Sequence, residues 1–292
     1  MKQYHKYKTT LILVLFAIFI CSCSKKEEQP PLVAVDLEIS EEIKDIIYFK
    51  GNEKASTVLI TIPGGPSTEF GTDLVDEISA TLNRTDILTV AVHQLQTLDS
   101  TIVKDNDITL DEANSFNAES IEMLYKTVAY FKNQDRTVYV FGLSFGAFIT
   151  QELIAKKGID SADKYLIMTG RLDMNDVIWQ GAAEGRDGFF EDGITPIVKA
   201  DPDPAAKERN LNRIGAGFLM NRYTQLFSTI DDLSNITYVY GATDEAVGSL
   251  TPEEVQFLRS KNTNILAGGG NHEDTIGEFL LQGFNDAFGI KL

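Results

Sequence analysis

Short apolar runs alternate with amphipathic stretches along residues 33–292, and this alternation predicts the secondary structure. Helices are expected over 111–133 and 274–288, where apolar residues recur three or four positions apart. Residues 33–49 are expected to supply one or two leading antiparallel strands. The remaining strands are predicted from β-branched, aliphatic and aromatic runs at 57–62, 87–92, 137–141, 164–169, 236–241 and 264–270. Strands that alternate with helices favour an α/β fold, with a mostly parallel sheet and helices on both faces.

One region interrupts the alternation. About 65 residues without a clear strand pattern separate the runs 164–169 and 236–241, which is too long for an ordinary connection. We expect an insertion over about 172–233, with a helical part over 205–227. It could be a helical lid that shapes a pocket, or a packing insertion that never touches substrate. Its aromatic side chains could line an apolar pocket or form the lid's own core. These side chains belong to Trp179, Phe189, Phe190, Phe218 and Tyr223.

A glycine-flanked serine follows the apolar run at 137–141. The segment Gly142-Leu143-Ser144-Phe145-Gly146 stands between that strand and a helical pattern. A serine on so sharp a turn projects its hydroxyl above the sheet, as a nucleophile requires. The alternative is a glycine-rich turn whose serine only caps the helix.

Two further polar residues follow the ends of later strands. Asp244 comes soon after the strand 236–241, and His272 follows the strand 264–270. The carboxyl ends of parallel strands share one edge of a sheet, so both should lie near Ser144. The chain has three histidines, which leaves few rivals to His272 as a general base. Glu245 and Asp173 are the rival acids to Asp244.

The order Ser144, Asp244, His272 resembles that of α/β-hydrolases. The resemblance implies an α/β-hydrolase domain over 33–292, with an oxyanion hole formed by the backbone N–H of Phe145 and one from Gly64 or Gly65. The segment Pro63-Gly64-Gly65-Pro66-Ser67 is similar to the His-Gly-Gly-Pro-Gly motif of capped hydrolases of the proline iminopeptidase type. It departs from that motif because Pro63 replaces the histidine and Ser67 the last glycine.

The resemblance implies a serine hydrolase that forms an acyl-enzyme on an ester, thioester or amide. A small molecule or short peptide is the expected substrate. No cofactor is implied, and no metal, since one usable histidine and no thiol in the domain offer no ligand cluster. Two alternatives stay open, namely a proline iminopeptidase-like aminopeptidase and a non-catalytic binding module on a hydrolase fold.

The first residues predict export and lipidation. Three lysines precede a short apolar run, which is typical of a signal peptide, here 1–22. The segment Ile20-Cys21-Ser22-Cys23 resembles a bacterial lipobox, in which Cys23 is acylated. Residues 23–32 would then be a polar tether. We therefore expect a lipid-anchored protein of the cell envelope, on the periplasmic or outer face of the outer membrane, whose membrane contact is its N-terminal lipid.

The charge balance excludes one class of partner. The chain has 26 basic and 43 acidic residues, with a formal net charge of −17. Loss of the leader would remove three lysines and no acidic residue. Nucleic acid is not expected as a partner, because phosphate binding needs a basic surface.

Overall fold

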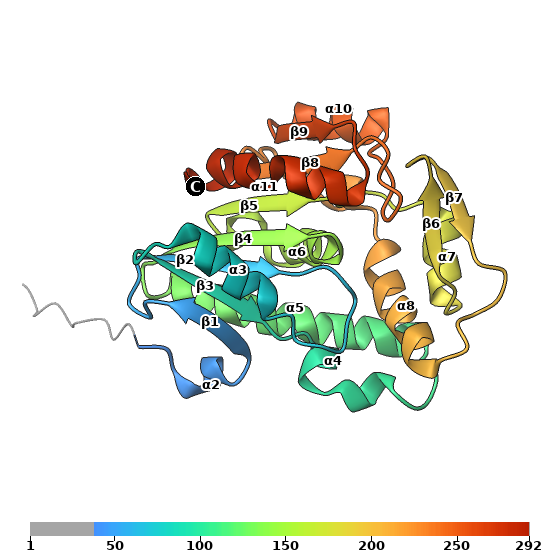
Figure 1. The fold of residues 1–292 in the computed structure, drawn as a ribbon, viewed down its shortest axis with the longest axis horizontal. Helices are drawn as coiled ribbons and strands as arrows, with labels where there is room; N and C mark the ends of the chain where they lie inside the picture. Colours follow the sequence, from blue (N-terminus) through green and yellow to red (C-terminus); the bar gives the residue numbers. More distant parts are fainter. Residues whose placement is uncertain (1–37, 292) are drawn as a thin grey trace, which may run out of the picture. The chain divides into compact units, whose positions relative to one another are not determined.

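The computed structural model describes residues 38–291, which form a seven-stranded sheet covered by helices on both faces (Figure 1). The strand order is β1-β3-β2-β4-β5-β8-β9; β1 is antiparallel to β3 and every other pair is parallel. The strands are β1 Ile47–Gly51, β2 Thr57–Ile62, β3 Ile87–Val92, β4 Thr137–Leu143, β5 Lys164–Met168, β8 Ile236–Gly241 and β9 Asn264–Gly268. The expected α/β architecture is confirmed.

Strict alternation along the central strands builds a core on each face of the sheet. In β4, Val138 and Val140 join the larger core, whereas Phe141 joins the smaller one. In β5, Ile167 and Leu166 divide in the same way. Because successive side chains point to opposite faces, a strand buried on both sides reads as a continuous apolar run.

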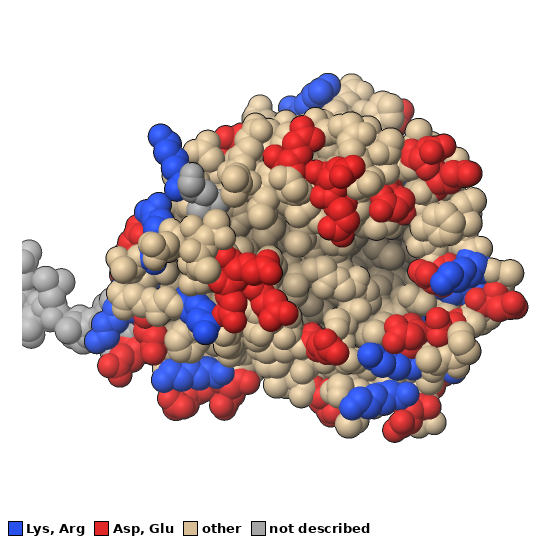
Figure 2. Space-filling model, in the orientation of Figure 1, with Lys and Arg blue, Asp and Glu red and all other residues tan. Residues whose placement is uncertain are grey.

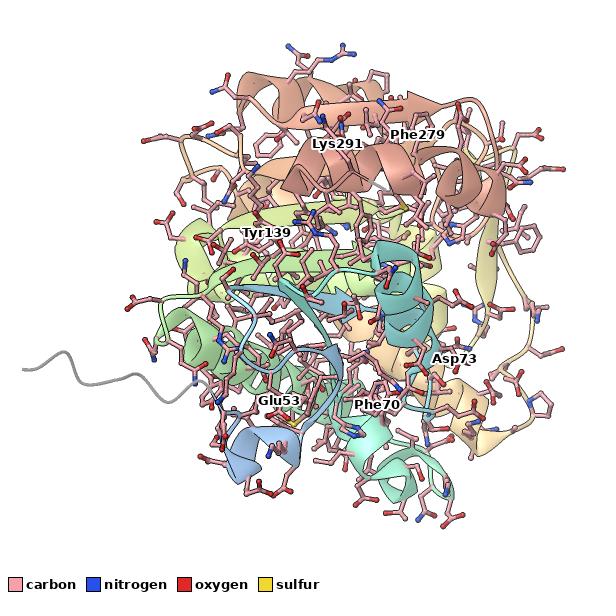
Figure 3. The ribbon with its side chains drawn as sticks, turned by 60° about the vertical axis from the view of Figure 1, so that its left-hand side comes forward. Glu53, Phe70, Asp73, Tyr139, Phe279 and Lys291 are labelled. Atoms are coloured by element: carbon pink, nitrogen blue, oxygen red, sulfur yellow. The ribbon has the colours of Figure 1, made fainter. Side chains whose placement is uncertain are left out.

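Four helices cover the two faces. The larger core lies under α5 (Leu110–Lys132) and α6 (Phe145–Lys157), and the smaller one under α3 (Asp73–Leu82) and α11 (His272–Phe288). Figure 3 labels Tyr139 of β4 and Phe279 of α11, which both belong to the smaller core. Short helices α2 (Glu41–Lys44), α4 (Leu95–Leu98) and α10 (Pro252–Ser260) lie at the periphery, with 3-10 turns at 100–103 and 159–161.

The insertion between β5 and β8 contains a β-hairpin, so the prediction that this region lacks strands is wrong. Strands β6 (Gly188–Glu191) and β7 (Thr195–Val198) pair antiparallel, apart from the main sheet. They stand between α7 (Asp176–Ala183) and α8 (Ala206–Leu219), and α9 (Tyr223–Leu226) follows. In Figure 1 the hairpin, α7 and α8 lie beyond the carboxyl ends of the parallel strands.

Buried polar contacts fix the insertion to the rest of the domain. The fully buried Asn210 of α8 accepts from the Ile108 N–H (2.9 Å) and donates to the carbonyl of Val103 (2.9 Å). The Phe190 N–H of β6 donates to the Glu245 carbonyl (2.7 Å). The hairpin is therefore bonded directly to the loop that carries Asp244.

One antiparallel strand, β1, precedes β2, within the one or two expected. No helix in the described part of the chain is long and apolar enough to cross a membrane.

Candidate active site

Ser144 stands at the turn between β4 and α6 with φ 55° and ψ −115°, which few non-glycine residues adopt. Glycine is required on both sides of Ser144, at Gly142 and Gly146, because α6 and the sheet approach each other closely here. A Cβ at Gly146 would overlap the Ile62 carbonyl oxygen of β2, and one at Gly142 would overlap Thr150 of α6. The Ser144 N–H donates to the Met168 carbonyl of β5 (2.9 Å), which ties the turn to the next strand.

The structure brings Ser144, His272 and Asp244 into one chain of hydrogen bonds. His272 Nε2 lies 3.0 Å from Ser144 Oγ, and His272 Nδ1 lies 2.8 Å from Asp244 Oδ2. The other Asp244 oxygen accepts from the N–H groups of Ala246 (2.9 Å) and Val247 (3.0 Å). Since a carboxylate only accepts, it places the proton on Nδ1 and leaves Nε2 as the acceptor that faces the serine.

The surroundings of His272 act on its pKa in opposite directions. The residue is 8% exposed, and burial alone lowers the pKa of the ring. The hydrogen bond to Asp244 and the negative charges of Asp244, Glu273 and Glu245 outweigh this, so the net pKa lies above the ordinary 6.5. A neighbouring carboxylate favours the charged imidazolium form. The site therefore stabilises His272 after it takes up a proton.

The rival acids have other partners. Glu245 Oε2 accepts from the backbone N–H of His272 (3.2 Å), not from its ring. Asp173 accepts from the N–H of Thr224 (3.1 Å) and from its hydroxyl, within the insertion. His93 stacks on Phe70 with ring centroids 3.5 Å apart, and its Nδ1 lies 3.0 Å from Thr97 Oγ1. These residues lie outside the Ser144 chain of hydrogen bonds.

The residues expected to form the oxyanion hole lie beside Ser144. Phe145 opens α6, and the first N–H groups of a helix have no acceptor within it. A Cβ built on Gly64 would lie 3.8 Å from Ser144 Oγ, and one on Gly65 would lie 3.6 Å from the Phe145 ring. The loop after β2 and the start of α6 therefore both lie next to the Ser144 hydroxyl.

A cavity of about 260 Å³ opens beside Ser144; we call it the Ser144 pocket. Figure 2 shows this face of the molecule hollowed between the end of the sheet and the insertion, with acidic side chains around it. The pocket walls combine apolar and polar surface in similar amounts, and three charged or amide side chains, Arg186, Asp187 and Asn212, line it. The apolar lining comes from α6, α7, α8, the segment before α7 and the loop after β8, and includes Phe148, Met174, Ile178, Ala182, Leu219 and Val247.

The five aromatic residues considered for a lid do not line the Ser144 pocket. Phe190, Phe218 and Tyr223 are at most 1% exposed in the larger core, while Phe189 is 44% exposed. Phe190, Phe218 and Tyr223 therefore form part of a core instead of lining this pocket, and the exposed Phe189 does neither. The sequence analysis did not predict the aliphatic side chains that line the Ser144 pocket. The apolar face of α7 is the sequence feature that could have indicated them.

Across residues 38–291, no group of three or more His, Cys, Asp or Glu side chains is arranged to hold a metal ion. The signal peptide, Cys23 and the tether lie outside the described residues.

Comparison with solved structures finds the same fold at low sequence identity. A highly thermostable carboxyl esterase from Bacillus coagulans superposes with a TM-score of 0.54 and 13% identity, over 84% of this chain and 93% of the other. The α/β-hydrolase GrgF from Penicillium sp. sh18 gives a TM-score of 0.51 and 13% identity, over 83% and 92%. A scan against protein-family models found no match, and no curated protein matches the sequence. The chain therefore has the α/β-hydrolase fold.

Proposed function

We propose that this chain is a serine hydrolase that cleaves an acyl bond through a covalent acyl-enzyme. The observation that carries the proposal is the chain of hydrogen bonds from Ser144 through His272 to Asp244, which begins at a serine in a rare backbone conformation. Such strain is kept at functional sites where the surrounding structure imposes it. A serine that only caps a helix would need neither the histidine nor the buried acid.

The geometry supports the following roles. His272 Nε2 takes the Ser144 hydroxyl proton as Oγ attacks the substrate carbonyl, and Asp244 stabilises the resulting imidazolium. The N–H of Phe145 and that of Gly64 or Gly65 bind the developing oxyanion, each donor worth about 3 kcal/mol. His272 then gives the proton to the leaving group. In the second half-reaction it activates water, which releases the acid and restores Ser144.

Carboxyl esters are the first substrates to test. The Ser144 pocket has an apolar wall that suits an acyl chain, and a solved structure of the same fold is a carboxyl esterase. The insertion closes one side of this pocket, so we propose that it acts as the lid. A panel of p-nitrophenyl esters and thioesters, with prolyl and alanyl aminopeptidase substrates beside them, would identify the scissile bond and test the iminopeptidase alternative.

The nucleophile is tested by labelling with a fluorophosphonate probe. The wild-type protein should be labelled on Ser144, and Ser144→Ala should lose labelling and turnover, down to the residual that binding and the oxyanion hole supply. Ser115→Ala, at an exposed position of α5, is the matched control and should keep both. Full turnover by Ser144→Ala would refute the assignment. A wild-type protein that is neither labelled nor active would favour the non-catalytic binding module.

A further inference from the structure

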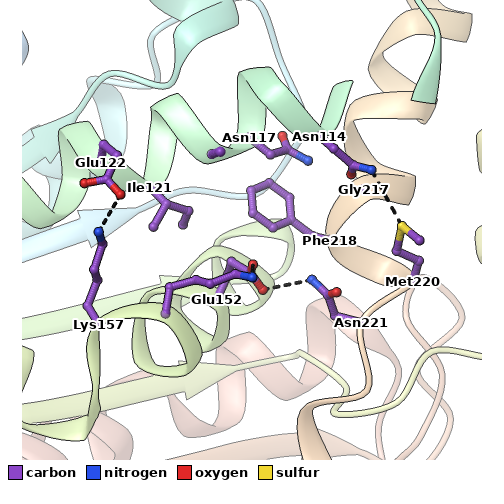
Figure 4. A pocket seen from close by; sticks show the side chains of 12 residues that line it. Asn114, Asn117, Ile121, Glu122, Glu152, Lys157, Gly217, Phe218, Met220 and Asn221 are labelled. Carbon is purple, nitrogen blue, oxygen red and sulfur yellow. Dashed lines mark hydrogen bonds and ion pairs between the residues drawn. The ribbon is translucent and has the colours of Figure 1, made fainter. Parts of the chain in front are cut away.

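A second cavity, of about 440 Å³, lies between α5, α6 and α8, outside the Ser144 pocket; we call it the Glu152 cavity (Figure 4). Its volume is within the range of small-molecule sites. Ile121 and Phe218 give it an apolar part, and three asparagines, two carboxylates and two lysines give it a polar part. The proposed catalytic mechanism uses none of these polar residues.

The asparagine side chains leave oxygen atoms without a partner. Asn117 Nδ2 donates to the Ile214 carbonyl (2.9 Å), and Asn221 Nδ2 donates to Glu152 Oε2 (2.8 Å). These acceptors fix which way each amide points, since the flipped amide would set oxygen against oxygen. Among the described residues, neither amide oxygen accepts a hydrogen bond. Each Nδ2 uses one of its two N–H groups in these bonds, so the cavity offers both acceptors and donors.

Glu152 adds a buried negative charge. The residue is 7% exposed, and its Oε2 accepts from Asn221 and from the Tyr223 hydroxyl (3.1 Å). Among residues 38–291, its Oε1 accepts no hydrogen bond, and the Lys156 ammonium lies 3.7 Å from it. Burial raises the pKa of Glu152, which the Lys156 charge and these hydrogen bonds only partly offset. A cation hydrogen-bonded to Oε1 would favour the charged form of Glu152.

The two lysines at the cavity differ. Lys157 is bound to Glu122, and its ammonium lies 4.8 Å from the Tyr125 ring centroid, so its charge is satisfied (Figure 4). Lys156 is 60% exposed and too far from Glu152 for a hydrogen bond. A long, exposed side chain can swing into water at little loss, because exposed ion pairs contribute little. Lys156 thus occupies a position near Glu152 that another ammonium could take.

From these contacts we propose that the Glu152 cavity binds a small molecule with a primary ammonium group. The ammonium donates to Glu152 Oε1, and its hydrocarbon part lies against Ile121 and Phe218. An ammonium has three donors and no acceptor, which suits a carboxylate oxygen that accepts no hydrogen bond. An anion is disfavoured because the buried charge at this cavity is the Glu152 carboxylate.

The test is calorimetric titration of the full-length protein with pentylamine and, as a neutral control of equal length, 1-pentanol. Pentylamine should bind saturably and 1-pentanol should not. Equal binding of both, or no saturable binding of pentylamine, would overturn the proposal. Nα-acetyl-lysine methylamide tests the other source of an ammonium, a peptide lysine, and should bind more weakly; tighter binding than pentylamine would contradict the small-molecule ligand.

Variants locate the site. Glu152→Gln should weaken pentylamine about tenfold or more, as expected when a charge-assisted hydrogen bond is lost. Lys156→Gln should tighten binding severalfold, because the internal competitor is removed. Ser144→Ala should bind like the wild type, which separates this site from the proposed catalytic one.

A second variant tests the same site in case the buried substitution Glu152→Gln disturbs the fold. Ala118 is exposed at the cavity rim, so Ala118→Trp should abolish binding by occlusion while its circular dichroism stays native. Unchanged binding by Glu152→Gln and Ala118→Trp would place the ligand elsewhere and refute the site.

Discussion

At the scale of single residues, the contacts of His272 determine how the proposed activity depends on pH. Its ring must be neutral to accept the Ser144 proton, and its pKa lies above the ordinary 6.5. The acid limb of kcat/KM, which reports the free enzyme, should therefore lie above pH 6.5. Burial opposes this shift and Asp244 is the main group that raises the pKa, so the two effects can be separated by mutation.

Asp244→Asn should lower kcat about 10³- to 10⁴-fold, because the wrong tautomer of His272 then faces Ser144. The acid limb should also move to lower pH, since burial remains and the charge is lost. Stopped-flow or endpoint pH–rate profiles measure both. Glu245→Gln is the matched control, because that carboxylate accepts from the His272 backbone N–H and not from its ring; it should keep most of the rate. An unmoved limb in Asp244→Asn, or equal losses in both variants, would contradict the assignment.

At the scale of elements, α7 and α8 determine the shape of the Ser144 pocket. Ile178 and Ala182 stand one turn apart on α7 and line the pocket together, and Leu219 of α8 also contributes to the wall. The hairpin between these helices is bonded to the loop after β8 through Phe190. The insertion therefore both walls the pocket and supports the loop that holds Asp244.

Ala182→Leu should narrow the pocket and shift the preference among p-nitrophenyl esters towards shorter acyl chains. Loss of room for one or two methylenes corresponds to about a tenfold or larger change in relative kcat/KM between long and short esters. Val177→Leu also enlarges a side chain, by one carbon, at a 51% exposed position of the same helix and should leave the profile unchanged. If both variants retain the wild-type profile, α7 does not contact the acyl chain.

The sheet was more predictable than the insertion for a physical reason. The runs 57–62, 87–92 and 236–241 match β2, β3 and β8, because strands buried on both faces are continuously apolar. The hairpin was missed because each strand has four residues and β7 contains Pro196, which weakens a strand pattern. Ser144, Asp244 and His272 were expected to lie close together because each follows the carboxyl end of a predicted strand. The lining of the Ser144 pocket depends instead on how α7 and α8 pack, which no local sequence pattern encodes.

At the scale of the whole molecule, the lipid anchor predicted from the sequence would be attached to a domain that has two cores of its own. Residues 38–291 bury both faces of the sheet, and the acidic surface in Figure 2 gives anionic headgroups little to attract. Membrane attachment would therefore depend on acyl chains at Cys23. Two or more chains anchor a protein stably, while one binds only marginally.

Cys23→Ser should leave the unprocessed precursor, because acylation and cleavage both require that thiol. Cys21→Ser, the matched control two residues earlier, should still be processed. Mass spectrometry of the membrane-extracted protein would distinguish them. An unmodified mature N-terminus at another residue would rule out the lipoprotein proposal.

The φ of 55° at Ser144 also implies a trade-off between stability and activity. A residue held in such a region costs about 1–3 kcal/mol, which a glycine would not incur, although glycine loses about 0.5–1 kcal/mol more chain entropy on folding. Ser144→Gly should therefore resist denaturant better than Ser144→Ala, since both lack the hydroxyl and the strain that glycine avoids exceeds its extra entropy cost. Selection for stability alone would therefore favour a residue other than serine at position 144, although the proposed chemistry depends most on that position.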